Sequence, residues 1–219
     1  MRKLKILLLV TLVSFTWGTT WLAMKVASET IPPIFATGMR FVFAAPFLIC
    51  IAWLTKAPLL FPQGQRLFQI KICIFYFAIP FSLMIYGDTH ISSGLASIIF
   101  ANMPIAILIA TIIILKNKTN ITQAAGLALA TAALIGILIN ESESNTELQW
   151  QAVLALVAAV IMHAVIYAQC KKISCTVSAL TFNALPCFSA GLLLSTVGWF
   201  IETPQIADFS INSLLFTIY

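Results

Sequence analysis

Long apolar runs, separated by short polar segments, follow one another along almost the whole chain. A helix needs about 20 residues, at a rise of about 1.5 Å each, to cross a hydrocarbon layer about 30 Å thick. Runs of that length cover residues 6–27, 33–55, 70–87, 92–115, 121–140, 151–169 and 177–200, and an eighth run begins near Ile211 but stops at Tyr219. Because lipid offers no hydrogen bonds to a backbone, we expect these runs to be helices. The pattern predicts an all-α integral membrane bundle with seven complete transmembrane helices and the start of an eighth.

The composition supports this class and excludes a soluble domain. Of the 219 residues, 61% are hydrophobic and 9% are charged, whereas soluble domains carry about 25% charged residues. The five cysteines form neither a C-x-x-C pair nor a ligand spacing, so no disulfide framework, metal site or other cofactor is expected. The basic N-terminus before ILLLVTLVSF also fits a secretory signal peptide, but the bulky WGTTW that follows offers no small-residue cleavage site.

Charged residues divide between the two sides of the predicted bundle. Ten of the twelve Lys and Arg lie near the N-terminus or around the connections after the second, fourth and sixth runs, and all seven acidic residues lie on the opposite side. By the positive-inside rule the basic side, with the N-terminus, is cytoplasmic. We therefore expect a multi-pass protein of the bacterial cytoplasmic membrane, in contact with the lipid bilayer and with no nucleic-acid partner. The two exceptions to the charge division are Lys25 and Arg40.

The most polar stretch, ESESNTELQW at residues 141–150, divides the chain in two. Five predicted helices precede it, so a repeat that starts after it would cross the membrane in the opposite direction. Transporters built in this way bind their substrate between two antiparallel halves near the middle of the membrane. We therefore expect a five-helix half at 1–140, an extracytoplasmic linker at 141–150 and an incomplete second half at 151–219, in an inverted-repeat helical bundle.

Lys25 and Arg40 are the candidate polar residues near the outer side. Lys25 lies close to the end of the first run, where its ammonium can extend to the interface or pair with Glu29 one turn on. Arg40 lies about 10 Å inside the membrane if the second helix begins near Pro33. A cation at that depth is costly unless it faces a wet cavity or a partner. Two interpretations remain open: cations that favour anionic groups in a cavity, or side chains that reach for water.

Three further residues are candidates for a cavity inside the bundle. His163 is the one side chain near the middle of the membrane that titrates near neutral pH. Proton coupling therefore competes with a neutral histidine that is hydrogen-bonded to a neighbouring helix. Asn102 lies two residues before Pro104 and is expected to bind carbonyl groups that the proline frees. Trp17 is too deep for an interfacial anchor, which leaves a role in lining a cavity.

Prolines inside the runs are candidate helix kinks. Each removes a backbone hydrogen bond and bends the helix, although membrane helices tolerate proline well. The four candidates are Pro46, Pro80, Pro104 and Pro186.

Two more groups of side chains carry an expectation about packing. Small residues at four-residue spacing in the fifth run predict close approach to another helix. They are Ala124, Ala128, Ala132 and Gly136. At an outer turn, Tyr86, Asp88 and His90 form a polar cluster that is expected to be solvated.

Several stretches resemble the drug/metabolite transporter superfamily in its EamA-type branch. WGTTWLAMKVASETIPPIFATGMRFVFAAP is similar to the WG…K and P…R signature of that family's first two helices, and Lys25 and Arg40 match its recurring Lys and Arg. YGDTHISSGLASIIFANMPIAILIATIIIL resembles its third-to-fourth helix region, and ITQAAGLALATAALIGILI its fifth helix. VLALVAAVIMHAVIYAQCKK fits the opening of the second repeat. The segment KNKTN departs from the family, which has a glutamate after the fourth helix.

The resemblance implies ten helices in two five-helix repeats, of which this chain would hold about seven. It also implies a secondary transporter, most often an exporter of small organic metabolites such as amino acids, that works by alternating access and is driven by a proton gradient or by exchange. A truncated, non-transporting fragment that pairs as a homodimer or with a complementing chain is the alternative. An enzyme is disfavoured, because His163 alone stands at membrane depth where catalysis would need a cluster of His, Asp or Glu.

Overall fold

The computed structural model describes residues 2–116, 120–144, 149–172, 177–205, 207 and 209–218. Helices and the turns that join them make up this part of the chain. The helices are α1 (Arg2–Ala27), α2 (Pro33–Leu54), η1 (Gln63–Gln65), α3 (Arg66–Ile72), the π-helix η2 (Cys73–Ala78), α4 (Ile79–His90), α5 (Ser93–Ala101), α6 (Met103–Leu115), α7 (Ile121–Ser144), α8 (Trp150–Lys172), α9 (Ala179–Glu202) and α10 (Ile211–Ile218).

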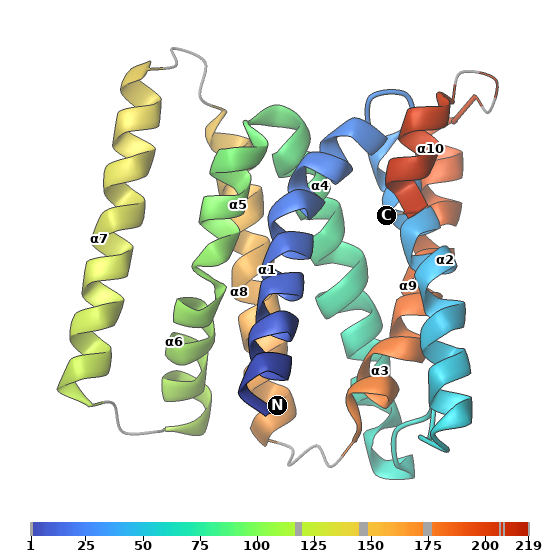
Figure 1. The fold of residues 1–219 in the computed structure, drawn as a ribbon, viewed down its shortest axis with the longest axis horizontal. Helices are drawn as coiled ribbons and strands as arrows, with labels where there is room; N and C mark the ends of the chain where they lie inside the picture. Colours follow the sequence, from blue (N-terminus) through green and yellow to red (C-terminus); the bar gives the residue numbers. More distant parts are fainter. Residues whose placement is uncertain are drawn as a thin grey trace.

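Seven of the described segments are long and apolar enough to cross a membrane. The short α10 follows them, so the predicted all-α membrane bundle, with seven spans and a shorter eighth helix, is confirmed. Successive spans run in opposite directions (Figure 1). We call the end of the bundle that carries the N-terminus the inner end, and the opposite end the outer end. That the inner end is cytoplasmic stays a prediction.

The predicted linker at 141–150 falls partly outside the part that can be described. Helix α7 continues to Ser144, and residues 145–148 are not among the described residues. The division into halves at 1–140 and 151–219 therefore stays a prediction.

Two of the membrane spans are interrupted near a proline. In the span Gln63–His90, the π-helix η2 ends directly before α4, whose first turn contains Pro80. The next span breaks at Asn102, between α5 and α6, two residues before Pro104. Isolated π turns occur inside α-helices and are frequent at functional sites. Both interruptions change the direction in which the following side chains point.

Helices α2 and α9 form the closest pair in the bundle. A Cβ atom on Gly38 would lie 2.8 Å from Ser195 Cα, and one on Gly191 would lie 2.8 Å from Phe41 Cβ. A Cβ on Gly198 would lie 2.6 Å from the Phe35 nitrogen. Small residues at a crossing let two membrane helices approach through their backbones, where dispersion contacts hold them together. The α2·α9 pair is therefore packed too tightly for larger side chains at these positions.

Hydrogen bonds join this pair at both ends. At the outer end, the Glu202 carboxylate accepts from the backbone N–H groups of Ile34 at 3.0 Å and Phe35 at 2.9 Å. A carboxylate there accepts hydrogen bonds from two of the N–H groups left free at the start of α2. Its negative charge also interacts favourably with the positive end of the helix dipole. At the inner end, Thr181 Oγ1 donates to the Pro58 carbonyl at 2.6 Å. Pro46 and Pro186 lie inside α2 and α9, which continue through them.

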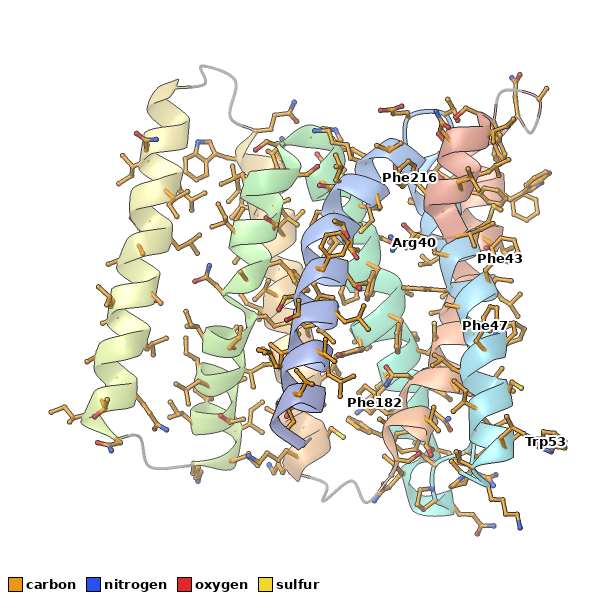
Figure 2. The ribbon with its side chains drawn as sticks, in the orientation of Figure 1. Arg40, Phe43, Phe47, Trp53, Phe182 and Phe216 are labelled. Atoms are coloured by element: carbon orange, nitrogen blue, oxygen red, sulfur yellow. The ribbon has the colours of Figure 1, made fainter. Side chains whose placement is uncertain are left out.

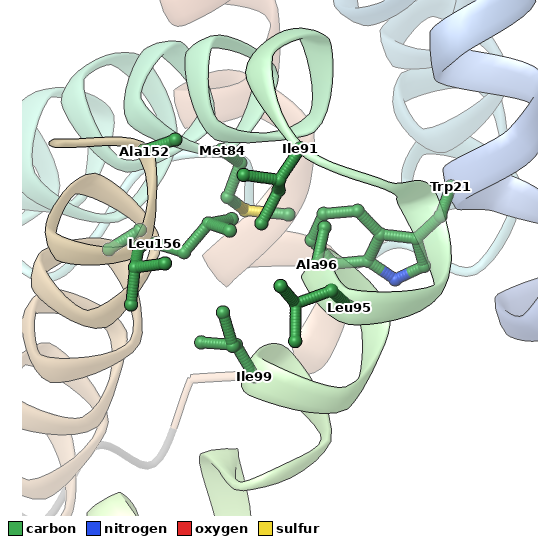
Figure 3. Packing of buried hydrophobic residues seen from close by; sticks show 10 residues of the cluster. Trp21, Met84, Ile91, Leu95, Ala96, Ile99, Ala152 and Leu156 are labelled. Atoms are coloured by element: carbon green, nitrogen blue, oxygen red, sulfur yellow. The ribbon is translucent and has the colours of Figure 1, made fainter. Parts of the chain in front are cut away.

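A second core joins α1, α4, α5 and α8 near the outer end (Figure 3). Trp21 packs there edge-on against Phe100, with ring centroids 5.4 Å apart. Leu156 of α8 is fully buried and lies against Gly87 of α4. This core fixes the outer part of α1 against the rest of the bundle, whereas the described side chains of α1 before Thr19 are exposed.

Helix α7 stands at the edge of the bundle (Figure 1). Its most apolar window has no buried residue, and Leu134 and Leu138 are partly buried against the core. Cβ atoms added at Gly126 or Gly136 would meet nothing within 4 Å. The predicted close packing of the small-residue stripe is therefore wrong for the described chain, because the stripe has no helix beside it.

Candidate functional site

A cavity of about 430 Å³ lies between η2, α8 and α9 near the inner end. Its wall combines aromatic rings with hydrogen-bonding groups. The main lining residues are Tyr76, Tyr167, Lys171, Ser178, Phe182 and Asn183. Figure 2 shows Phe182 on the bundle side of α9, whereas Phe43, Phe47 and Trp53 point outward from α2. The cavity therefore offers flat apolar surfaces and polar groups to one small molecule.

Local structure places the lining of α9 at this point. Ser178 caps the helix, since its hydroxyl accepts from the Thr181 N–H at 3.1 Å, as serine does at many helix starts. Because Thr181 also binds the Pro58 carbonyl, the first turn of α9 is tied to the loop after α2. Phe182 and Asn183 follow directly in the chain. The hydrogen bond of Thr181 to Pro58 therefore helps to hold these two lining residues in place.

An aromatic cluster continues from the cavity toward the middle of the bundle. The Tyr76 ring lies 4.6 Å from the His163 ring and 5.2 Å from the Phe182 ring, measured between centroids. Phe81 and Phe100 each lie 5.6 Å from His163. Edge-to-face contacts of this kind stabilise pairs of rings by about 0.5–1.5 kcal/mol beyond their burial. The cluster brings together η2, α4, α5, α8 and α9.

His163 is the centre of this cluster. The side chain is 3% exposed, and its Nδ1 lies 2.8 Å from the Ala159 carbonyl. Since a carbonyl can only accept, Nδ1 carries a proton and donates to its own helix. The structure thus holds His163 through rings on neighbouring helices and a hydrogen bond within α8. Its contacts are those of a packed aromatic side chain.

Lys25 binds a partner that the sequence did not indicate. Its ammonium donates to the Ile91 carbonyl at 3.1 Å, at the turn between α4 and α5. Glu29, the expected partner, is exposed. Because Ile91 follows the last turn of α4, its carbonyl is not used inside a helix and is open to a side-chain donor.

Asp88 is buried, which corrects the expectation of a solvated cluster. Its exposed fraction is 0%, and neither carboxyl oxygen has a hydrogen-bond partner among the described residues. Tyr86 and His90 are exposed, as expected, and their rings lie 4.3 Å apart. Asp88 occupies the opposite side of α4, near Lys25 of α1 and Ser93 of α5.

Arg40 and Trp17 lie apart from the cavity and from each other. The Arg40 side chain is half-buried and extends from α2 toward α4 (Figure 2). Trp17 is 72% exposed on the outside of α1. Asn102 Nδ2 donates to the Ile98 carbonyl at 2.8 Å, at the break between α5 and α6. The predicted candidates are thus spread over the bundle, with His163 alone beside the cavity.

Sequence reasoning missed the residues that form the cavity wall. Tyr76, Tyr167, Phe182 and Asn183 carry no motif, and aromatic side chains are common throughout the chain. The π turn before Pro80 is the one local signal that could have drawn attention to Tyr76. Groups of three or more metal-binding side chains are absent from the residues that can be described.

The sequence of this chain is similar to those of several known membrane transport proteins. A family model described as the EamA-like transporter family matches residues 4–139. Protein PagO of Salmonella typhimurium is 64% identical over 219 residues, which cover 100% of this chain and 72% of the relative. An uncharacterized transporter of Buchnera aphidicola is 53% identical over 219 residues, covering 100% of this chain and 73% of that protein. A Chlamydia trachomatis protein named S-adenosylmethionine/S-adenosylhomocysteine transporter is 24% identical over 192 residues, covering 84% and 59%. No solved structure matches the chain.

Proposed function

The chain belongs to the EamA-like transporter family, and we propose that it is a secondary transporter that exports small organic metabolites of amino-acid size. Membership of a transporter family, and of no enzyme family, gives the general class. The substrate, the direction of transport and the mechanism are proposals that rest on the geometry of this molecule.

The cavity at the inner end is the observation that carries the proposal. Its volume of about 430 Å³ falls in the range of about 300–1,000 Å³ that is usual for small-molecule sites. The Tyr76, Tyr167 and Phe182 rings offer apolar contact, while Asn183 and Lys171 offer donors for a carboxylate. A zwitterionic metabolite with an apolar side chain would meet both kinds of surface. With the inner end cytoplasmic, such a solute would enter from inside the cell.

Alternating access would then take place around the α2·α9 pair. Glycine contacts and end-to-end hydrogen bonds make this pair the rigid part of the bundle. The spans that contain η2 and the break at Asn102 are the ones with irregular backbone, and they carry Tyr76 and Phe100 against His163. Rocking of these spans would close the cavity at the inner end and open a path toward the outer end.

Uptake into proteoliposomes tests the proposal. The full chain is reconstituted, and radiolabelled amino acids, S-adenosylmethionine, a nucleotide and a cationic drug are offered in turn. We expect uptake of at least one zwitterionic metabolite, and at least a tenfold loss of uptake in Phe182→Ala and Asn183→Ala. Trp53→Ala is the matched control, because Trp53 is 78% exposed on α2 and points away from the cavity. A folded chain that carries none of these compounds would contradict the proposal, as would equal losses in the cavity and control variants.

A further inference from the structure

Buried polar atoms without partners gather at one place in the described chain, the junction of α4 and α5. Among the described residues, four buried side-chain oxygen atoms lack a hydrogen-bond partner. Both carboxyl oxygens of Asp88 and the Ser93 hydroxyl lie at this junction, and the Ser195 hydroxyl lies on α9. Three of the four therefore belong to two neighbouring residues. Buried polar groups in proteins are nearly always paired, so this group calls for an explanation of its own.

A lysine and a serine lie close to Asp88 in the described part of the chain. Lys25 of α1 is near enough for its charge to act on the Asp88 carboxyl, and the Ser93 hydroxyl lies beside that carboxyl without the geometry of a hydrogen bond. The Lys25 ammonium nevertheless donates to the Ile91 carbonyl at 3.1 Å, and it makes no hydrogen bond to Asp88. On the α8 side, the neighbouring Gly87 lies against the apolar Leu156 side chain.

This geometry suits an uncharged carboxyl group. An ionised carboxylate without water, donors or a bonded cation is strongly disfavoured in an apolar interior, and such groups usually take up a proton instead. Once Asp88 is ionised, Lys25 and Ser93 can both turn to it, since an ammonium has three donors and a hydroxyl has one. Lys25 thus has two acceptors, the Ile91 carbonyl and the Asp88 carboxylate.

We propose that Asp88 is a proton-binding site and that Lys25 exchanges between Ile91 and Asp88 as the proton arrives and leaves. A proton from the outer water binds one Asp88 oxygen, and the Lys25 ammonium moves to the Ile91 carbonyl, the partner that it has in the structure. When the proton leaves, Lys25 returns to the carboxylate and draws the outer part of α1 toward α4. Proton binding stands independently of transport, whereas its use to drive export rests on the proposed function.

Other titratable groups on the elements around α4 are further from this role. Tyr86 and His90 lie on the exposed side of α4 itself. His163 of α8 and Tyr76 of η2 belong to the aromatic cluster, about 10 Å along α8 from Leu156 at the helical rise. Arg40 of α2 extends toward α4 (Figure 2), and α5 carries no titratable side chain. Lys25 is the charge that acts on Asp88.

The sequence allows a direct test, because Asp88 and Asp208 are its two aspartates. The full chain is made with aspartate labelled with ¹³C in the side-chain carboxyl and placed in lipid nanodiscs. The two carboxyl resonances are then followed as the pH is changed. Asp88→Asn and Asp208→Asn each remove one resonance and so assign the other, and thermal unfolding checks that both variants are folded.

We expect the Asp88 resonance to titrate separately from that of Asp208. In Lys25→Met, loss of the nearby cation should strengthen proton binding at Asp88 by about tenfold or more, with the Asp208 titration unchanged. Glu29→Gln, at an exposed acid on the same side, is the control and should leave Asp88 as in the wild type.

Three results would overturn the inference: joint titration of Asp88 and Asp208, no effect of Lys25→Met, or a midpoint that follows sodium concentration at fixed pH. The last result would identify a sodium site. Uptake assays separate the two proposals. A chain that transports while Asp88 fails to titrate refutes the proton site alone, and a chain that titrates as expected but carries no solute refutes the proposed function alone.

Discussion

The α2·α9 pair and helix α7 both contain small residues on one side of a membrane helix, yet they have opposite surroundings. In the pair, Gly38 and Gly191 face the partner backbone so closely that an added Cβ would clash. On α7, Gly126 and Gly136 have open space around them. A stripe of small residues permits close approach, but it does not say that a partner is present within the same chain.

The α2·α9 pair has polar contacts in addition to its glycine contacts. Glu202 binds the start of α2, and Thr181 binds the loop that follows α2, so hydrogen bonds tie α9 to this part of the chain at both ends. In the α2·α9 pair, side-chain hydrogen bonds at the helix ends therefore add to the close glycine contacts along the crossing.

The largest expected effect comes from filling the crossing of α2 and α9. Gly38→Leu should destabilise the protein by about 3 kcal/mol or more, because the side chain would overlap the Ser195 backbone. Gly136→Leu is the matched control on α7 and should change stability by less than about 0.5 kcal/mol. Thermal unfolding and size-exclusion profiles in detergent measure both. Equal effects of the two substitutions would mean that the pair is no tighter than α7.

Removing the outer hydrogen bonds should have a smaller effect. Glu202→Ala leaves the N–H groups of Ile34 and Phe35 without their acceptor, which should cost about 1–2 kcal/mol by the measure of other helix caps. Glu29→Ala, at an exposed acid on the same side of the bundle, is expected to be nearly neutral. If the two variants unfold at the same temperature, the hydrogen bonds of Glu202 to Ile34 and Phe35 do not stabilise the α2·α9 pair.

The smallest effect is expected at the inner end. Thr181→Val keeps the shape of the side chain but loses the hydrogen bond to the Pro58 carbonyl, at a cost of about 1 kcal/mol. Thr196→Val is a suitable control, because the Thr196 hydroxyl is exposed and bonds only within α9, to the Leu192 carbonyl at 2.7 Å. Unfolding curves recorded side by side would reveal the difference, and a Thr181 variant as stable as its control would argue against an anchor.

Apolar length was enough to predict the seven spans of the described chain, whereas the membrane side assigned from the division of charges stays a prediction. The third span shows the limit of hydropathy, since 70–87 was expected and the helical segment extends from Gln63 to His90. Gln69 lowers the hydropathy there, yet it is buried, because its amide accepts from the Phe61 N–H at 3.1 Å and donates to the Leu59 carbonyl at 2.8 Å. Because both partners belong to the loop just before the segment, the pairing of Gln69 cannot be recognised from the span alone.

The candidate site was harder to predict, for a physical reason. In lipid, both the buried and the outward sides of a helix are apolar, so periodicity does not tell which aromatic residues face inward. Tyr76, His163 and Phe182 meet only because three helices take particular rotations. Asp88 was expected in water because of its place near the end of a span, and its burial depends on cover from α1 and α5. Lys25 was recognised as unusual, but its carbonyl partner lies 66 residues away.

The contact between Glu202 and the start of α2 has a consequence for how the protein is made. Ile34 leaves the ribosome 168 residues before its acceptor does, which at about 5–20 residues per second means roughly ten to thirty seconds of synthesis. During that time the N–H groups at the start of α2 lack their carboxylate acceptor. Water at the membrane interface can accept hydrogen bonds from them until Glu202 is made. Residues 4–139, which match the family model as one unit, therefore do not contain all the partners of their own helices. The start of α2 obtains its acceptor only when α9 has been made.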